Sequence, residues 1–192
     1  MNDKREIRGW AMYDWANSAF TTTVVTALLG PYVLALAESS PEPLSILGVP
    51  IEPVAIYTFA VGFSVLLQIP LLPLLGTIVD YTHLKKRILL TFAYIGAFAT
   101  ILLFFVRTDM IIFGTNGAIV LGSILSIIAN LCFGSAIVAY NSFLPERASP
   151  DRRDSVSSQG FALGYLGGGL LLLINLGMIL LMDDTALAIR LS

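Results

Sequence analysis

The side chains that could do chemistry are few, and they do not cluster. Asp14 stands near the start of a long apolar run, whereas Asp80 and His83 lie in a short polar stretch without an acid, base or metal-binding partner at helical spacing. The only cysteine, Cys132, lies inside another apolar run, so the sequence offers neither an intrachain disulfide nor a thiolate metal site. This pattern predicts a protein that is not an enzyme and needs no metal or cofactor.

Two interpretations fit the position of Asp14 near the beginning of its apolar run. In the first turn of a helix, unpaired backbone amides and the helix dipole stabilise an anion, so the carboxylate would act as a cap. Alternatively, the carboxylate would carry a proton or contact the amine of a substrate. No other charged group or histidine lies deep in an apolar run, so the sequence shows no obvious proton relay.

Polar side chains recur at helical spacing along two apolar runs. They are Asp14, Asn17 and Thr21 in the first run and Asn130 and Asn141 in the fourth. Because an unpaired polar group is costly in hydrocarbon, both faces should point into a helix bundle. They would either line a substrate pathway or form hydrogen bonds between helices, each worth only about 0.6 to 2 kcal/mol.

Glycines mark one face of the last apolar run. Gly160, Gly164, Gly167 and Gly168 recur at a spacing that lets the backbone of another helix approach closely. No strand is predicted before them, so they do not indicate a phosphate-binding loop. We expect either a helix-packing surface with a dedicated neighbour or a bend in this helix.

The composition defines the class of protein that must position these residues. Hydrophobic residues make up 56% of the chain and charged residues only 12%, whereas a soluble domain carries about 25% charged residues. The partner of most of the surface is therefore a lipid bilayer. The basic residues form separate small groups rather than one stripe, which argues against a nucleic-acid partner.

Five apolar runs are long enough to cross a bilayer as helices. We predict a single all-α transmembrane domain over residues 1–192, with two polar loops in the cytoplasm. The spans are about 14–37, 54–79, 88–106, 118–140 and 160–182, and the cytoplasmic loops are 80–87 and 144–158.

Lys and Arg indicate the orientation of these runs, because cytoplasmic loops carry an excess of both. With a cytoplasmic amino terminus, nine of the eleven cations fall inside and only Arg107 and Arg190 fall outside. Five crossings then place the carboxyl terminus outside. In a prokaryote, the membrane would be the plasma membrane.

Several short motifs resemble a known family. Gly76 and Asp80, followed by Lys85, Lys86 and Arg87, resemble the signature loop between the second and third helices of the major facilitator superfamily. Three further stretches resemble one branch of that superfamily, the branch related to the vacuolar amino-acid effluxers of fungal autophagy. They are residues 13–20 (YDWANSAF), 140–146 (YNSFLPE) and 160–168 (GFALGYLGG). The resemblance covers nearly the whole chain.

The resemblance implies a secondary transporter that alternates access between two six-helix halves, with amino-acid efflux as one activity. It also implies that Asp80 and the three cations form part of a conformational latch, although His83 and Leu84 depart from the family's loop pattern. Five spans correspond to the amino-terminal portion of such a protein. We therefore expect either a truncated amino-terminal part of a transporter or a transporter whose remaining helices come from a longer chain or from a partner. The alternative is a non-transporting membrane interaction or regulatory subunit.

Overall fold

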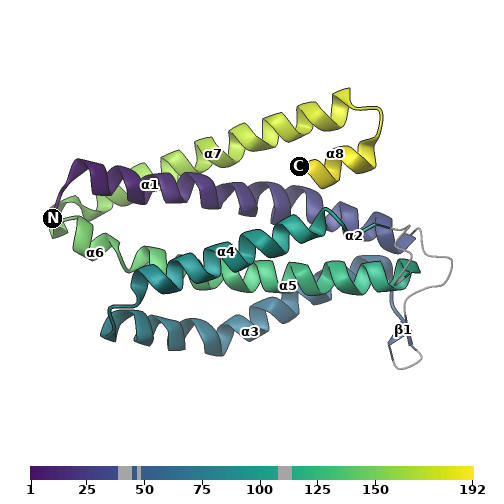
Figure 1. Cartoon of the computed structure of the whole chain (residues 1–192), viewed down its shortest axis with the longest axis horizontal. Coiled ribbons are helices and arrows are strands. Elements are labelled where there is room, and N and C mark those ends of the chain that lie inside the picture. Colours follow the sequence, from purple (N-terminus) through teal and green to yellow (C-terminus); the bar gives the residue numbers. More distant parts are fainter. Residues whose placement is uncertain (39–44, 47–48, 108–113) are drawn as a thin grey trace.

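The computed structural model describes residues 1–38, 45–46, 49–107 and 114–192, and the chain is almost entirely helical there (Figure 1). The helices are α1 (Lys4–Ala19), η1 (Phe20–Leu28), α2 (Leu29–Glu38), α3 (Pro53–Tyr81), α4 (Lys85–Leu103), α5 (Gly114–Asn141), α6 (Leu144–Arg147), η2 (Pro150–Arg152), α7 (Arg153–Leu181) and α8 (Thr185–Leu191). Two short strands, β1 (Ser45–Ile46) and β2 (Val49–Pro50), pair antiparallel.

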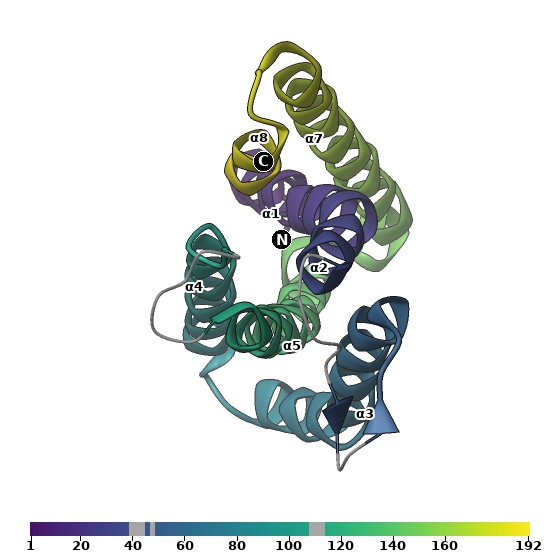
Figure 2. The same ribbon diagram turned by 90° about the vertical axis from the view of Figure 1, so that its right-hand side faces the viewer.

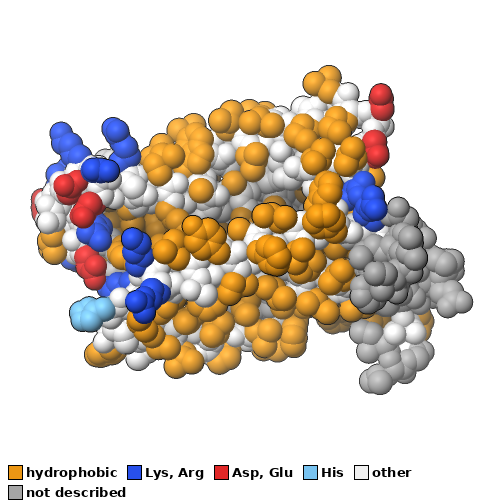
Figure 3. All heavy atoms as spheres, viewed as in Figure 1, with side chains coloured by type: hydrophobic (Ala, Val, Ile, Leu, Met, Phe, Trp, Pro, Cys, Tyr) orange, Lys and Arg blue, Asp and Glu red, His pale blue; other side chains and the backbone are white. Residues whose placement is uncertain are grey.

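Five helical segments are long and apolar enough to cross a membrane: Lys4–Glu38, Ala55–Tyr81, Lys85–Leu103, Gly117–Arg147 and Pro150–Leu181. The prediction of an all-α membrane protein with five spanning helices is therefore confirmed. Large apolar side chains cover the sides of the bundle, and charged side chains gather mainly at the end that carries the amino terminus (Figure 3). Tyr165 is 81% exposed and Leu181 is 86% exposed, as expected for side chains that face lipid.

The first span begins earlier than its apolar run. Asp3 caps α1, because its Oδ1 accepts hydrogen bonds from the backbone amides of Arg5 (2.7 Å) and Glu6 (3.2 Å). Asp14 lies ten residues after Lys4, about 15 Å along the helix. The interpretation of Asp14 as a first-turn helix cap is therefore wrong, because a charged turn that the apolar pattern could not reveal precedes it.

The first span, Lys4–Glu38, contains a π-helical segment, η1, between α1 and α2. Six of its nine residues are β-branched Thr or Val, which crowd the backbone of a regular helix. The hydroxyl of Thr26 donates to the carbonyl oxygen of Thr21 at 2.8 Å, and such bonds from Thr side chains bend helices. Wide turns of this kind are rare and often lie beside functional sites.

The two polar loops are shorter than predicted. Helix α3 continues to Tyr81, so only residues 82–84 separate it from α4. In the predicted 144–158 loop, α6 and η2 are helical, and α7 already begins at Arg153. The predictions followed apolarity, whereas helices continue into the polar interface wherever their backbone bonds can form.

The spanning helices form two groups, which are visible end-on in Figure 2. Helix α1 packs along α7, while α3 and α4 both pack on α5. Helix α2 joins the groups at one end, since it contacts both α3 and α5. The preceding segment η1 is also bound to α3, because the Tyr57 hydroxyl donates to the carbonyl oxygen of Val25 at 2.7 Å. Helix α4 makes few contacts with α1 and lies apart from it in the end-on view (Figure 2).

Candidate functional site

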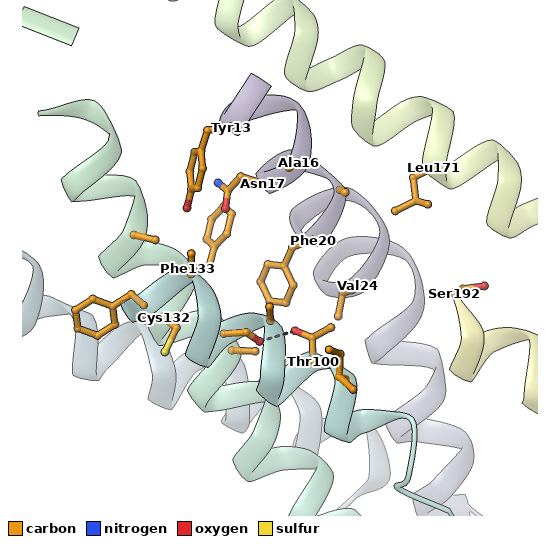
Figure 4. Close-up of a pocket in the computed structure, with 18 residues that line it drawn as sticks. Tyr13, Ala16, Asn17, Phe20, Val24, Thr100, Cys132, Phe133, Leu171 and Ser192 are labelled. Atoms are coloured by element: carbon orange, nitrogen blue, oxygen red, sulfur yellow. Dashed lines mark hydrogen bonds between the residues drawn. The ribbon is translucent and has the colours of Figure 1, made fainter. Parts of the chain in front are cut away.

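A cavity of about 410 Å³ lies where the two helix groups diverge (Figure 4). Its wall comes from α1 and η1 on one side and from α4 and α5 on the other. The lining includes Tyr13, Asn17, Phe20 and Val24; Phe92, Ala93, Gly96, Ala97 and Thr100; and Ala129, Cys132, Phe133 and Ala136. This volume lies in the range of small-molecule sites, which is about 300 to 1,000 Å³.

Few polar groups face this cavity. The Thr100 hydroxyl donates to the carbonyl oxygen of Gly96 at 2.9 Å, so its hydrogen is already used (Figure 4). The side chains of Tyr13 and Asn17 make no hydrogen bond within the described part of the chain. They are therefore the groups in the wall that can offer both a donor and an acceptor to a bound molecule.

The predicted pathway residues separate in the structure. Asn17 lines the cavity, whereas Thr21, Asn130 and Asn141 do not. Asn141 is the last residue of α5 and is exposed. Asp14 is 9% exposed and faces α7 rather than the cavity.

Asn130 serves helix packing between α3 and α5. Its Nδ2 donates to the hydroxyl of buried Ser64 at 2.7 Å, and Ser64 donates to the carbonyl oxygen of Val61 at 2.6 Å. One turn farther along α5, Gly134 leaves space that the Gln68 side chain fills, because a Cβ there would clash with Gln68 Oε1. For Asn130, the structure favours interhelical hydrogen bonding over a pathway.

The four predicted glycines of α7 are buried, and α1 packs against them. A Cβ on Gly160 would lie 2.7 Å from the ring of Trp10, and one on Gly167 would lie 2.7 Å from the carbonyl oxygen of Trp15. A Cβ on Gly168 would lie 2.6 Å from Thr22 Oγ1. The glycines therefore let α1 and α7 approach along their length.

An aromatic cluster links this pair of helices to α5. The rings of Trp10 and Tyr140 are stacked with centroids 4.5 Å apart, and Tyr13 stacks on the same Tyr140 ring at 5.1 Å. Trp10 Nε1 donates to the carbonyl oxygen of Tyr140 at 3.1 Å. The Tyr140 hydroxyl is buried and makes no hydrogen bond.

The predicted latch residues lie at the end of the molecule that carries the amino terminus (Figure 1). Lys85 forms an ion pair with Glu146 at 2.6 Å and donates to the carbonyl oxygen of Ser142 at 3.3 Å. Asp80, Lys86 and Arg87 are exposed, and no ion pair joins them to another described residue. Gly76 is partly buried on α3, where a Cβ would only touch Val138 Cγ1 at 3.9 Å, an ordinary contact.

The segment that follows α5 also holds the amino-terminal head. The backbone amide of Asn2 donates to the carbonyl oxygen of Arg147 at 2.7 Å, and the Asn2 side chain donates to Ser149 Oγ at 3.0 Å. Arg147 forms an ion pair with Glu6 of α1 at 2.8 Å. The segment therefore connects two helices across the end of the bundle. Its Arg147 pairs with Glu6 of α1, and its Glu146 pairs with Lys85 of α4.

Sequence reasoning missed the α4 wall of the cavity and the Trp10–Tyr140 contact. The α4 residues are small or apolar, so no chemical signal distinguished them from lipid-facing positions. Trp10 and Tyr140 stand at opposite ends of different apolar runs, and only the fold brings them together. Tyr140 does begin one of the motif stretches, which was the one available signal.

These features define a polytopic membrane protein with a small-molecule-sized cavity between two groups of spanning helices. The family model described as "Vacuole effluxer Atg22 like" matches residues 2–192. The chain belongs to this family, and the resemblance to the effluxer branch is confirmed.

Two relatives illustrate the relationship. An MFS-type transporter of Bacillus subtilis, YxiO, is 31% identical over 196 residues, an alignment that covers 98% of this chain and 41% of that protein. Autophagy-related protein 22 of Pyricularia oryzae is 30% identical over 170 residues and covers 74% of this chain and 24% of that protein. The chain thus spans less than half the length of either relative. No solved structure gives a significant match.

Proposed function

We propose that this chain forms part of a secondary transporter that exports small molecules, and that amino acids are among its substrates. The observation that carries the proposal is the cavity between α1 and α4, which places Tyr13 and Asn17 in an otherwise mainly apolar wall. Such a wall suits a small molecule with an apolar body and a few hydrogen-bonding groups. Among amino acids, this chemistry favours those with uncharged, apolar side chains.

The comparisons support the same class. The matching family is described as vacuole effluxers, and the Bacillus subtilis relative is described as an MFS-type transporter. Members of the major facilitator superfamily expose a fixed substrate site to one side of the membrane and then to the other by moving one helix bundle against another. Because the chain spans 41% of that relative, we propose that it works together with further helices, which lie in the same chain or in a partner.

The exposed part of the loop motif suits a contact with those helices. Asp80, Lys86 and Arg87 are exposed and form no ion pair with any residue that the structure describes. We propose that these charges meet the second bundle in one conformation and release it in the other. The amino terminus then lies in the cytoplasm, where the excess of cations is expected.

Transport is tested with a chimera in which residues 1–192 replace the aligned portion of the Bacillus subtilis relative. The purified chimera is reconstituted in liposomes loaded with unlabelled amino acid, and counterflow of labelled amino acids is measured across a panel of side chains. We expect counterflow that is strongest for uncharged, apolar side chains. A folded chimera without counterflow of any amino acid would contradict amino-acid transport.

A matched pair of substitutions tests the cavity as the binding site. Asn17→Ala removes a polar group of the wall, whereas Asn141→Ala makes the same change at an exposed position outside the cavity. Loss of one hydrogen bond of about 1 kcal/mol should weaken apparent affinity roughly fivefold for Asn17→Ala. Equal effects of both substitutions would place the binding site elsewhere.

A further inference from the structure

Asp14 is a carboxyl group inside a membrane span with an unusual setting. It lies in the third turn of α1 and is 9% exposed. No lysine, arginine or histidine forms an ion pair with it in the described part of the chain, and no described residue donates a hydrogen bond to it. A carboxylate ion in this setting is costly, so a protein retains one in a span chiefly for function.

The surroundings of Asp14 are built from hydroxyl groups and glycine. Asp14 Oδ2 and Ser18 Oγ lie 3.0 Å and 2.6 Å from the point where a Cβ of Gly164 would stand. One turn away, the Tyr140 hydroxyl lies 3.3 Å from the corresponding point of Gly160. The bare glycine face of α7 therefore leaves the space that these three oxygens occupy.

Two observations indicate a ligand for this space. The Tyr140 side chain is 4% exposed, and its hydroxyl is buried without a hydrogen-bond partner. The residue that precedes Asp14, Tyr13, also stacks on the Tyr140 ring, with centroids 5.1 Å apart. Tyr13 lines the cavity, so the Asp14 surroundings adjoin the proposed substrate site.

We propose that Asp14 binds and releases a proton during the transport cycle, with the hydroxyls of Ser18 and Tyr140 completing its surroundings. The step is the addition of one proton to a carboxylate oxygen, taken from water on one side of the membrane and returned to water on the other. No other bond forms or breaks. The coupling of this proton to transport rests on the proposed function, whereas protonation of Asp14 can be measured without it.

A proton fits these surroundings better than a metal ion does. Nowhere in the described ranges do three His, Cys, Asp or Glu side chains gather as a metal site would require. The titratable groups nearby are Tyr13, the neighbour of Asp14 in α1, and Tyr140 of α5, whose ring stacks on Tyr13, while α7 faces Asp14 with Gly164. A single proton neutralises the one carboxylate and lets it donate a hydrogen bond.

The direct test is infrared difference spectroscopy of the 192-residue protein in lipid nanodiscs as pH is lowered. Wild type should show a carbonyl band of a protonated carboxyl group in apolar surroundings, and Asp14→Asn should lack it. Asp154→Asn is the matched control, because it removes an exposed carboxylate in the first turn of α7 and should leave the band unchanged. An identical band in Asp14→Asn would overturn the proposal.

Tyr140→Phe is the second variant, since it keeps the stacked ring and removes only the hydroxyl. The Asp14 band should persist but shift in frequency and in midpoint pH. If Asp14→Asn does not fold, an unchanged band in Tyr140→Phe would overturn the proposed surroundings.

Transport in the chimera then tests coupling. In Asp14→Asn, accumulation driven by a proton gradient should be lost while counterflow is retained, because exchange needs no net proton movement. Gradient-driven accumulation that survives in Asp14→Asn would overturn the coupling role, and accumulation that follows a sodium gradient instead would do the same. If wild type shows no counterflow, the proposed function fails, and the infrared result still decides whether Asp14 binds a proton.

Discussion

Trp10 of α1 and Tyr140 of α5 are joined twice. Their rings stack with centroids 4.5 Å apart and planes 9° from parallel, and Trp10 Nε1 donates to the Tyr140 carbonyl oxygen at 3.1 Å. Tyr13 of α1 stacks on the same Tyr140 ring, whereas most contacts of α1 are with α7 and most contacts of α5 are with α3 and α4. This pair therefore connects the two helix groups beside both the cavity and Asp14.

Loss of the Trp10 side chain should loosen that connection. We expect Trp10→Ala to reduce the free energy of unfolding by about 1 to 3 kcal/mol, which combines the stacking and the hydrogen bond. Trp10→Phe keeps a ring to stack and loses only the hydrogen bond, so its cost should be about 1 kcal/mol. Thermal unfolding in detergent measures both, and equal stability of the two variants would contradict a stacking contribution.

The glycine face of α7 allows a position-specific test. A Cβ on Gly164 would lie 2.6 Å from Ser18 Oγ, whereas one on Gly169 would meet nothing within 4 Å. Gly164→Ala should therefore cost about 1 to 3 kcal/mol through forced separation of α1 and α7. Gly169→Ala should be neutral or stabilising by up to about 1 kcal/mol, because alanine favours a helix.

Both alanine variants are compared by thermal unfolding in the same detergent. Similar losses of stability at the two positions would show that α1 does not pack on this face.

Much of the fold follows from apolar run length and residue size. Five long apolar runs suffice to predict five spanning helices, and the spacing of Gly160, Gly164, Gly167 and Gly168 indicates a packing face before any partner is known. The helix ends were less predictable. Asp3 caps α1 well before the apolar run begins, because a cap depends on local backbone geometry.

The candidate site was harder to predict, because helical spacing identifies a shared face but not its neighbour. Asn17 and Asn130 each belong to a polar stripe, yet one lines the cavity and the other donates to Ser64. The α4 wall consists of small and apolar residues such as Ala97, which resemble lipid-facing positions in sequence. Only the packing of several spans against one another creates the cavity, whose lining also includes Leu171 of α7.

The Asn130–Ser64 hydrogen bond should stabilise the α3–α5 pair without serving transport. We expect Asn130→Ala to cost about 0.6 to 1.7 kcal/mol, the range for interhelical hydrogen bonds in membranes. In a double-mutant cycle, Ser64→Ala should then add little further cost. Additive losses would indicate that the two side chains act independently, and a loss of counterflow larger than the loss of folded protein would give Asn130 a transport role.

The central claim is that substrate occupies the cavity between α1 and α4, and Cys132 reports on it directly. Cys132 is the only cysteine of the chain and lines the cavity, so the purified chimera, with the cysteines of its remaining portion replaced by serine, carries one relevant thiol. The decisive measurement is the rate at which a small maleimide labels that thiol, with and without a transported amino acid. We predict slow labelling that the amino acid slows further, and none in Cys132→Ser. Labelling that no transported amino acid slows would contradict the claim.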